Sequence, residues 1–144
     1  MKIQPRVFSL EEANAVIPQL EILFGKLDGK KDVFARRHDE LFMHELLVNA
    51  EPQHAADDSK HQLDHEAQTL DDLVIKVQRD IAEIHQLGCI IRNLEFGWID
   101  FLTRRGNAMI YFCWKRGEKF IQFYHLLDCN AAERNPLNVS LPHA

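Results

Sequence analysis

The chain has 144 residues and a formal net charge of −5, with 46% hydrophobic and 27% charged residues. This length fits one domain, and the composition is that of a globular protein with material for one core. A net negative charge argues against long-range attraction to nucleic acid or to an anionic membrane. We therefore interpret the Arg104-Arg105 pair as solvated loop charge rather than as a nucleic-acid site.

Three cysteines, Cys89, Cys113 and Cys129, are odd in number and form no C-x-x-C pair. Free thiols in a reducing compartment explain this spacing better than a disulfide framework or a zinc knuckle. The N-terminal residues lack the apolar core of a secretory leader, and no apolar run approaches the roughly 20 residues of a membrane span. We expect a cytoplasmic protein that does not insert into a membrane.

The first helix is expected to begin at Leu10. Ser9 is a suitable N-cap, and Glu12, three residues later, completes a capping box. Pro18 lies inside the helical pattern, where it removes a backbone donor and clashes with the preceding turn, so we expect a kink or break there. Beyond it, apolar residues recur at every seventh position: Leu27, Phe34, Leu41 and Val48.

The second helix has the most regular apolar pattern in the chain. Its apolar residues alternate at spacings of four and three, as in a coiled-coil seam: Leu63, Ala67, Leu70, Val74, Val77, Ile81 and Ile84. Gly88 stands where a glycine commonly ends a helix. Two long helices joined by a short loop run antiparallel, so residues 10–87 are expected to form a helical hairpin with its loop near 50–58.

Polar residues flank the sevenfold stripe of the first helix: Lys30, Lys31, Arg37, His38, His44 and Glu45. They line the edge of the hairpin, or they face a partner helix in a dimer, where polar seam residues set the register.

After Gly88 the apolar residues alternate or form short β-rich blocks. We expect strands at 97–103, 108–114 and 119–126, within an antiparallel meander at 89–127. Residues 128–144 are expected to form an irregular C-terminal tail. The predicted fold class is α+β, with a long antiparallel, coiled-coil-like helical hairpin packed on a small three-stranded antiparallel β-meander, in a single domain of residues 1–144.

The pleat of this meander decides where His125 points. If Lys115 pairs with Glu118 around a tight turn, with Gly117 at positive φ, His125 lies at the rim of a nearly all-apolar face. Asp100 and Glu118 then lie on the opposite, half-polar face. Under this register His125 is interpreted as a partly buried histidine with a hydrogen-bond partner, in preference to a ligand or acid–base group.

Other candidate sites are weaker. His61 and His65 have the i, i+4 spacing of a chelating pair, but the seam places both on the outer side of the second helix, and His44 completes the set of weak metal candidates. Cys113 lies mid-strand with no feature that would activate a thiol, so it is interpreted as a packing residue. No catalytic motif is present, so no catalytic residue and no cofactor are predicted.

Four ordered blocks resemble a bacterial family known as domain of unknown function 2203. They are FSLEEANAVIP (8–18), LGCIIRNLEFGWIDF (87–101), FCWKRGE (112–118) and FYH (123–125). The resemblance implies that these positions are of interest: Asp100, Phe101, Cys113, Trp114, Gly117, Glu118 and His125. A glycine-rich segment that follows the histidine in the family is represented here by Arg134 and Pro136.

The sequence thus favours a non-enzymatic interaction module, forming a homodimer through the hairpin or the half-polar sheet face. The alternative is a metal- or small-ligand-binding protein with a site near His125 at the junction of sheet and helices. In that alternative the candidate partners of His125 are Asp100, Glu118 and Arg134. A metal ion is considered only there.

Overall fold

The structure is a computed structural model that describes residues 5–51, 57–127 and 134–137. Its elements are two helices, α1 (Leu10–Ala50) and α2 (Asp57–Gln86), and five strands: β1 (Ile90–Asn93), β2 (Trp98–Arg105), β3 (Ala108–Lys115), β4 (Phe123–Leu126) and β5 (Asn135–Pro136). The chain forms two compact units. Met1–Phe24 with Ala82–Ala144 is called the sheet unit below, and Gly25–Ile81 is called the helix pair.

The start of α1 follows the predicted capping box. The Ser9 hydroxyl accepts a hydrogen bond from the Glu12 amide at 3.1 Å, and the Glu12 carboxylate accepts one from the Ser9 amide at 3.0 Å. These hydrogen bonds lower the pKa of Glu12. The predicted break at Pro18 is wrong, because α1 continues through this residue, whose ring is exposed.

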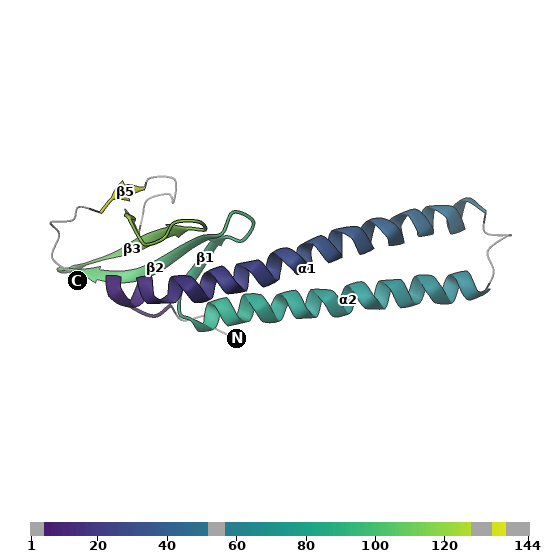
Figure 1. Ribbon diagram of the computed structural model, residues 1–144, viewed down its shortest axis with the longest axis horizontal. Coiled ribbons are helices and arrows are strands. Elements are labelled where there is room, and N and C mark those ends of the chain that lie inside the picture. Colours follow the sequence, from purple (N-terminus) through teal and green to yellow (C-terminus); the bar gives the residue numbers. More distant parts are fainter. Residues whose placement is uncertain (1–4, 52–56, 128–133, 138–144) are drawn as a thin grey trace. The chain divides into compact units, whose positions relative to one another are not determined.

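The five strands form one antiparallel sheet in the order β1-β2-β3-β4-β5 (Figure 1). The α+β fold class is confirmed, with five strands in place of the three predicted. The two additional strands are four and two residues long, too short for an alternating pattern to identify them. The predicted loop near 50–58 includes residues 52–56, which lie outside the described residues, as does most of the predicted tail, Cys129 included.

The register of the last hairpin differs from the predicted one. Tyr111 pairs with His125, and Phe112 pairs with Tyr124, so Lys115 and Glu118 are not a strand pair. Instead Glu118 closes a turn by donating its amide to the Lys115 carbonyl, with Gly117 at φ 99° as expected. The next residues leave the sheet before β4 begins. The offset is an odd number of residues, so β4 presents the opposite faces from those predicted.

The inner face of the sheet packs on the beginning of α1 within the sheet unit. Five residues predicted for this face are buried: Ile99, Phe101, Ile110, Phe112 and Trp114. Phe8 meets Phe101 edge-on at 5.0 Å between ring centroids, and Phe24 of α1 lies 6.3 Å from Trp114. Phe123 and His125 were also predicted for this face, and that assignment is wrong because of the register shift.

In the helix pair, the side chains buried where α1 and α2 pack are partly apolar and partly polar. Leu27, Leu41 and Leu70 are buried, while Val74, which was assigned to the seam, is 38% exposed. Lys30 forms an ion pair with the buried Asp80 of α2. No helix among the described residues is long and apolar enough to cross a membrane.

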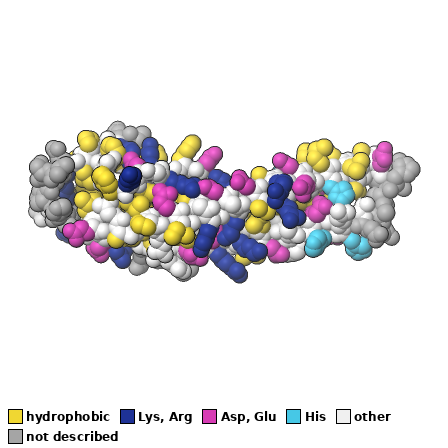
Figure 2. Space-filling model, viewed as in Figure 1, with side chains coloured by type: hydrophobic (Ala, Val, Ile, Leu, Met, Phe, Trp, Pro, Cys, Tyr) yellow, Lys and Arg dark blue, Asp and Glu magenta, His cyan; other side chains and the backbone are white. Residues whose placement is uncertain are grey.

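Two of the polar residues that flank the stripe of α1 face α2 of the same chain. Lys30 does so through Asp80, and His44 lies 3.4 Å from the carboxylate of Glu66. The interpretation that these two face a partner helix is therefore wrong. On the visible side of the helix pair, histidine and charged side chains are spread along its surface (Figure 2).

Candidate functional site

The outer face of the sheet holds a buried polar network around Asp100. His125 is 2% exposed, and its Nε2 lies 2.7 Å from Oδ2 of Asp100, whose side chain is fully buried. The same Oδ2 accepts a hydrogen bond from Nε of Arg92 at 2.6 Å. His125 and Asp100 thus share a face, and the prediction that they lie on opposite faces is wrong. The strands β1, β2 and β4 each contribute one member of this network.

Both nitrogens of His125 have an oxygen partner. Nδ1 lies 3.0 Å from the Leu126 carbonyl, and Nε2 faces the Asp100 carboxylate. A carbonyl and a carboxylate only accept hydrogen bonds, so each contact forms when the ring nitrogen that it uses carries a hydrogen. In this arrangement His125 connects β4 to β2.

Arg92 and Tyr111 complete one side of the network. The Arg92 guanidinium lies 4.8 Å from the centroid of the Tyr111 ring, and that ring lies 5.2 Å from the His125 ring. Burial alone would lower the pKa of Arg92, but its hydrogen bond to Asp100 and the charge of that carboxylate raise it. Arg92 therefore remains a cation beside the Asp100 side chain.

One oxygen of Asp100 has no partner among the described residues. Oδ1 is buried, and no hydrogen bond reaches it. A buried carboxylate oxygen without a donor is unfavourable, since the group has given up its hydration. Among the described members of this network, it is the buried side-chain oxygen left without a hydrogen-bond partner.

Cys113 lies opposite Asp100 in the β2–β3 ladder and is also buried. Burial raises the pKa of its thiol, although a hydrogen bond from the Trp98 indole opposes this effect. Burial raises the pKa of Cys89 to about 12. A thiol with a raised pKa is a poor nucleophile at neutral pH, in line with the packing role predicted for Cys113.

A second polar group forms around Glu118. Its carboxylate accepts hydrogen bonds from the Lys115 amide at 2.7 Å and from Nη2 of Arg134 at 2.7 Å. Arg134 also donates to the Cys113 carbonyl, and its guanidinium lies over the ring of Phe123. Burial alone would lower the pKa of Arg134, but Glu118 raises it. Glu118 and Arg134 therefore meet each other, while Asp100 and His125 form the neighbouring network.

Some members of these networks were not predicted from the sequence. No sequence motif marks Arg92, Tyr111 or Trp98. Their contacts depend on which residues the strands pair, and this register is not readable from local sequence. Arg92 reaches Asp100 because β1 pairs with β2, and this pairing is irregular between Ile91 and Asn93. A correct register for the last hairpin would have shown that His125 and Asp100 share a face.

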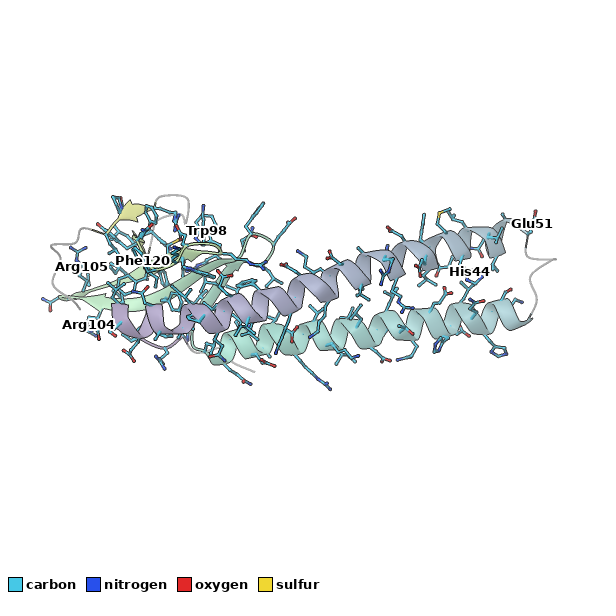
Figure 3. All side chains as sticks on the ribbon, in the orientation of Figure 1. His44, Glu51, Trp98, Arg104, Arg105 and Phe120 are labelled. Carbon is cyan, nitrogen blue, oxygen red and sulfur yellow. The ribbon has the colours of Figure 1, made fainter. Side chains whose placement is uncertain are left out.

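The histidines considered as weak metal ligands lie in the helix pair. His61 and His65 are exposed, and His65 lines a small pocket with Arg37, Glu40, Glu66 and Thr69. His44 points from α1 toward α2 (Figure 3), where it meets Glu66. Among the described residues, no group of three or more histidine, cysteine, aspartate or glutamate side chains is placed to hold a metal ion.

The helix pair also has an apolar surface that was not predicted. Phe42, Met43, Leu46 and Leu47 of α1, called the α1 patch below, are 54%, 63%, 48% and 65% exposed. Leu41 is buried, and at 100° per residue these four side chains turn away from it. Hydrophobic side chains gather on this part of α1 in Figure 2. Contiguous exposed apolar residues of this kind mark interaction sites more often than scattered ones.

Comparison with known proteins identifies the family. Residues 6–137 match the family described as "Uncharacterized conserved protein (DUF2203)", which confirms the resemblance inferred from the four sequence blocks. No curated protein and no solved structure matches the chain. The matched residues include the described parts of the sheet, the Asp100 network and the α1 patch. The chain therefore belongs to the DUF2203 family of uncharacterized conserved proteins.

Proposed function

We propose that this protein is a non-enzymatic assembly module that self-associates through the helix pair. The observation that carries the proposal is the α1 patch, four large apolar side chains that are each about half exposed or more. Covering such side chains releases about 25 cal/mol for each Å² of apolar surface removed from water. A protein partner is the occupant that this surface favours.

The state of the sheet unit supports a role without catalysis. The groups that resemble catalytic residues are engaged in holding strands together, since both nitrogens of His125 and one oxygen of Asp100 are bonded within the sheet. The thiols of Cys89 and Cys113 have raised pKa values. This chemistry favours a stable sheet over a reactive site.

The charges near the α1 patch argue against polyanionic partners. Residues 38–51 include four acidic side chains, Asp39, Glu40, Glu45 and Glu51, and no lysine or arginine. Nucleic acids and anionic membranes require cationic surfaces, so neither is a suitable occupant. The basic pair Arg104 and Arg105 lies in the sheet unit, as the last two residues of β2 (Figure 3).

The proposal is tested by measuring the mass of the protein in solution. Sedimentation velocity at micromolar concentrations should show a dimer, and the double variant Met43→Lys/Leu47→Lys should raise the dissociation constant by about 100-fold, because it places two charges in the contact. Ile75→Lys is the matched control, since Ile75 is an exposed apolar residue of α2 outside the patch. A wild-type protein that is monomeric at all accessible concentrations would overturn the proposal.

A second candidate function rests on the unpartnered Oδ1 of Asp100. Nε of Arg134 is likewise buried without a partner among the described residues. Cys113 contacts both neighbourhoods: it lies opposite Asp100, and its carbonyl accepts from Arg134. A polar ligand would have to donate a hydrogen bond to Oδ1 of Asp100, or accept one from Nε of Arg134. Native mass spectrometry of untagged protein, with metal analysis, tests this candidate; a bound mass lost in Asp100→Asn supports it, and bare protein argues against it.

A further inference from the structure

We propose that the partner on α1 is a second copy of this chain whose α1 runs antiparallel to the first. In this pairing Gly29 faces Leu47 of the other copy, Val33 faces Met43, and Arg36 faces Glu40. The inference rests on the proposed self-association and specifies its surface and register. All the residues involved lie in α1 within the helix pair.

The paired residues follow one stripe of α1. Gly29, Val33, Arg36, Glu40, Met43 and Leu47 are separated by alternating steps of four and three. This spacing is that of a coiled-coil seam, and it lies on a different side of α1 from the stripe of Leu27 and Leu41, which are buried. From Gly29 to Leu47 the stripe covers about 27 Å of helix. The contact is therefore longer than the α1 patch alone.

The stripe is complementary to itself when reversed. Read from either end, glycine is matched with leucine, valine with methionine, and arginine with glutamate. A two-fold antiparallel contact always matches residue i with j and j with i, and in this stripe the matched residues are also compatible in size and charge. A different protein as partner would require no such relation within one helix.

Gly29 is the least expected residue of the stripe. A glycine in a helix interior costs about 1 kcal/mol relative to alanine. A Cβ built at Gly29, and likewise at Gly25, would meet no atom within 4 Å, so packing within the described chain does not require either glycine. A second helix packed closely at this point gives Gly29 a role, since the absent side chain leaves space for Leu47 of the other copy.

The centre of the stripe is charged and self-complementary. Arg36 and Glu40 are exposed, and the antiparallel pairing places each Arg36 beside the Glu40 of the other copy. The two symmetry-related ion pairs set the register, because a shift along the helix would bring like charges together. Arg36 and Glu40 are also i, i+4 neighbours in one helix, with arginine first, the weaker order for such a pair.

Charge reversal tests the register. Arg36→Glu and Glu40→Arg should each raise the dissociation constant of the dimer at least about tenfold, because each places two pairs of like charges in the contact. The double variant Arg36→Glu/Glu40→Arg restores opposite charges and should restore dimerisation. Lys76→Glu, a charge reversal at an exposed position of α2, is the control and should have little effect.

Gly29→Leu gives an independent test with two readouts of opposite sign. Leucine is a better helix former than glycine, so the variant monomer should melt at a higher temperature. The added side chain fills the space for Leu47 of the other copy, so the dissociation constant of the dimer should rise by about tenfold or more. A structural role for Gly29 within the monomer would instead lower the melting temperature.

The outcomes separate this inference from the proposed function. If Met43→Lys/Leu47→Lys abolishes the dimer but charge reversal and Gly29→Leu leave it unchanged, the register is wrong and self-association remains. If the charge-swapped double variant stays monomeric while Lys76→Glu dimerises, the pairing of Arg36 with Glu40 is overturned. If the wild-type protein is a monomer throughout, both fail.

Discussion

In the sheet unit, the fully buried carboxylate of Asp100 is held by the Arg92 guanidinium and the His125 ring, on the opposite face of the sheet from the buried Phe101 and Trp114. In the helix pair, Asp80 is buried beside a single lysine, Lys30, whose side chain is 28% exposed. The helix pair also leaves the α1 patch open to solvent. Both units expose large apolar side chains, but in the helix pair four of them gather within residues 42–47 of α1, whereas the sheet unit buries a charged network beside an aromatic core.

This difference indicates where each unit draws its stability. Unfolding the sheet unit breaks a network that joins three strands, as well as an aromatic core. An isolated antiparallel helix pair buries little apolar surface, and most helical stability in proteins comes from packing an amphipathic face. We therefore expect the helix pair to gain more stability from a partner than the sheet unit does, as the proposed assembly through α1 requires.

Removal of the central carboxylate is the strongest test of the sheet network. Asp100→Ala removes the counter-ion of Arg92 and the buried hydrogen-bond partner of His125, so we expect a loss of about 3 kcal/mol in the free energy of unfolding. Asp100→Asn, which keeps the shape and one acceptor oxygen, should lose less. Urea denaturation monitored by tryptophan fluorescence reports on this unit because Trp98 and Trp114 both lie in it. A loss below 1 kcal/mol (about the size of one ordinary hydrogen bond) would contradict the network's role.

Breaking the ion pair of the helix pair should have a smaller effect. Lys30→Met leaves Asp80 buried without its counter-ion, but Lys30 is partly exposed and water can reach the pair, so we expect a loss of about 2 kcal/mol. The double variant Lys30→Met/Asp80→Leu replaces the pair by apolar side chains and should recover most of this stability. Far-ultraviolet circular dichroism, which reports helix content, follows the unfolding of α1 and α2. A double variant as unstable as the single one would show that the ion pair itself is required.

The sequence was sufficient to predict the fold class, both long helices and the inner face of β2 and β3, because these depend on repeated patterns. The capping box of Ser9 and Glu12 was predictable for the same reason, since it is defined by local spacing. Local rules failed at Pro18, where the exposed ring lies inside a helix that continues past it. Packing along the whole helix outweighed one missing donor.

The Asp100 network was not predictable because it depends on register. A tight turn at Lys115–Glu118 satisfies local turn chemistry, and the turn does form there. Beyond it the Asn14 side chain, distant in sequence, accepts a hydrogen bond from the Ile121 amide at 2.7 Å and holds the chain away from β3. β4 therefore starts later than expected, and an odd offset turns His125 toward Asp100. The α1 patch was missed because the sevenfold stripe of α1 explains only the side that faces α2.

The smallest expected effect concerns Cys89, whose ionisation should make the stability of the sheet unit, but not that of the helix pair, depend on alkaline pH. Burial raises the pKa of its thiol from 9.0 to about 12, so between these values the unfolded chain releases a proton that the folded chain keeps. The stability of the sheet unit therefore falls as pH rises through this window, by about 1.4 kcal/mol at pH 10 relative to neutral pH. The helix pair contains no cysteine, so its unfolding should lack this contribution. Cys89→Ala should remove this part of the alkaline loss and leave the part due to other groups, including the buried Cys113, as measured by urea denaturation from pH 8 to 10. Equal slopes for variant and wild type would show that the Cys89 thiol ionises in the folded protein as readily as in the unfolded chain.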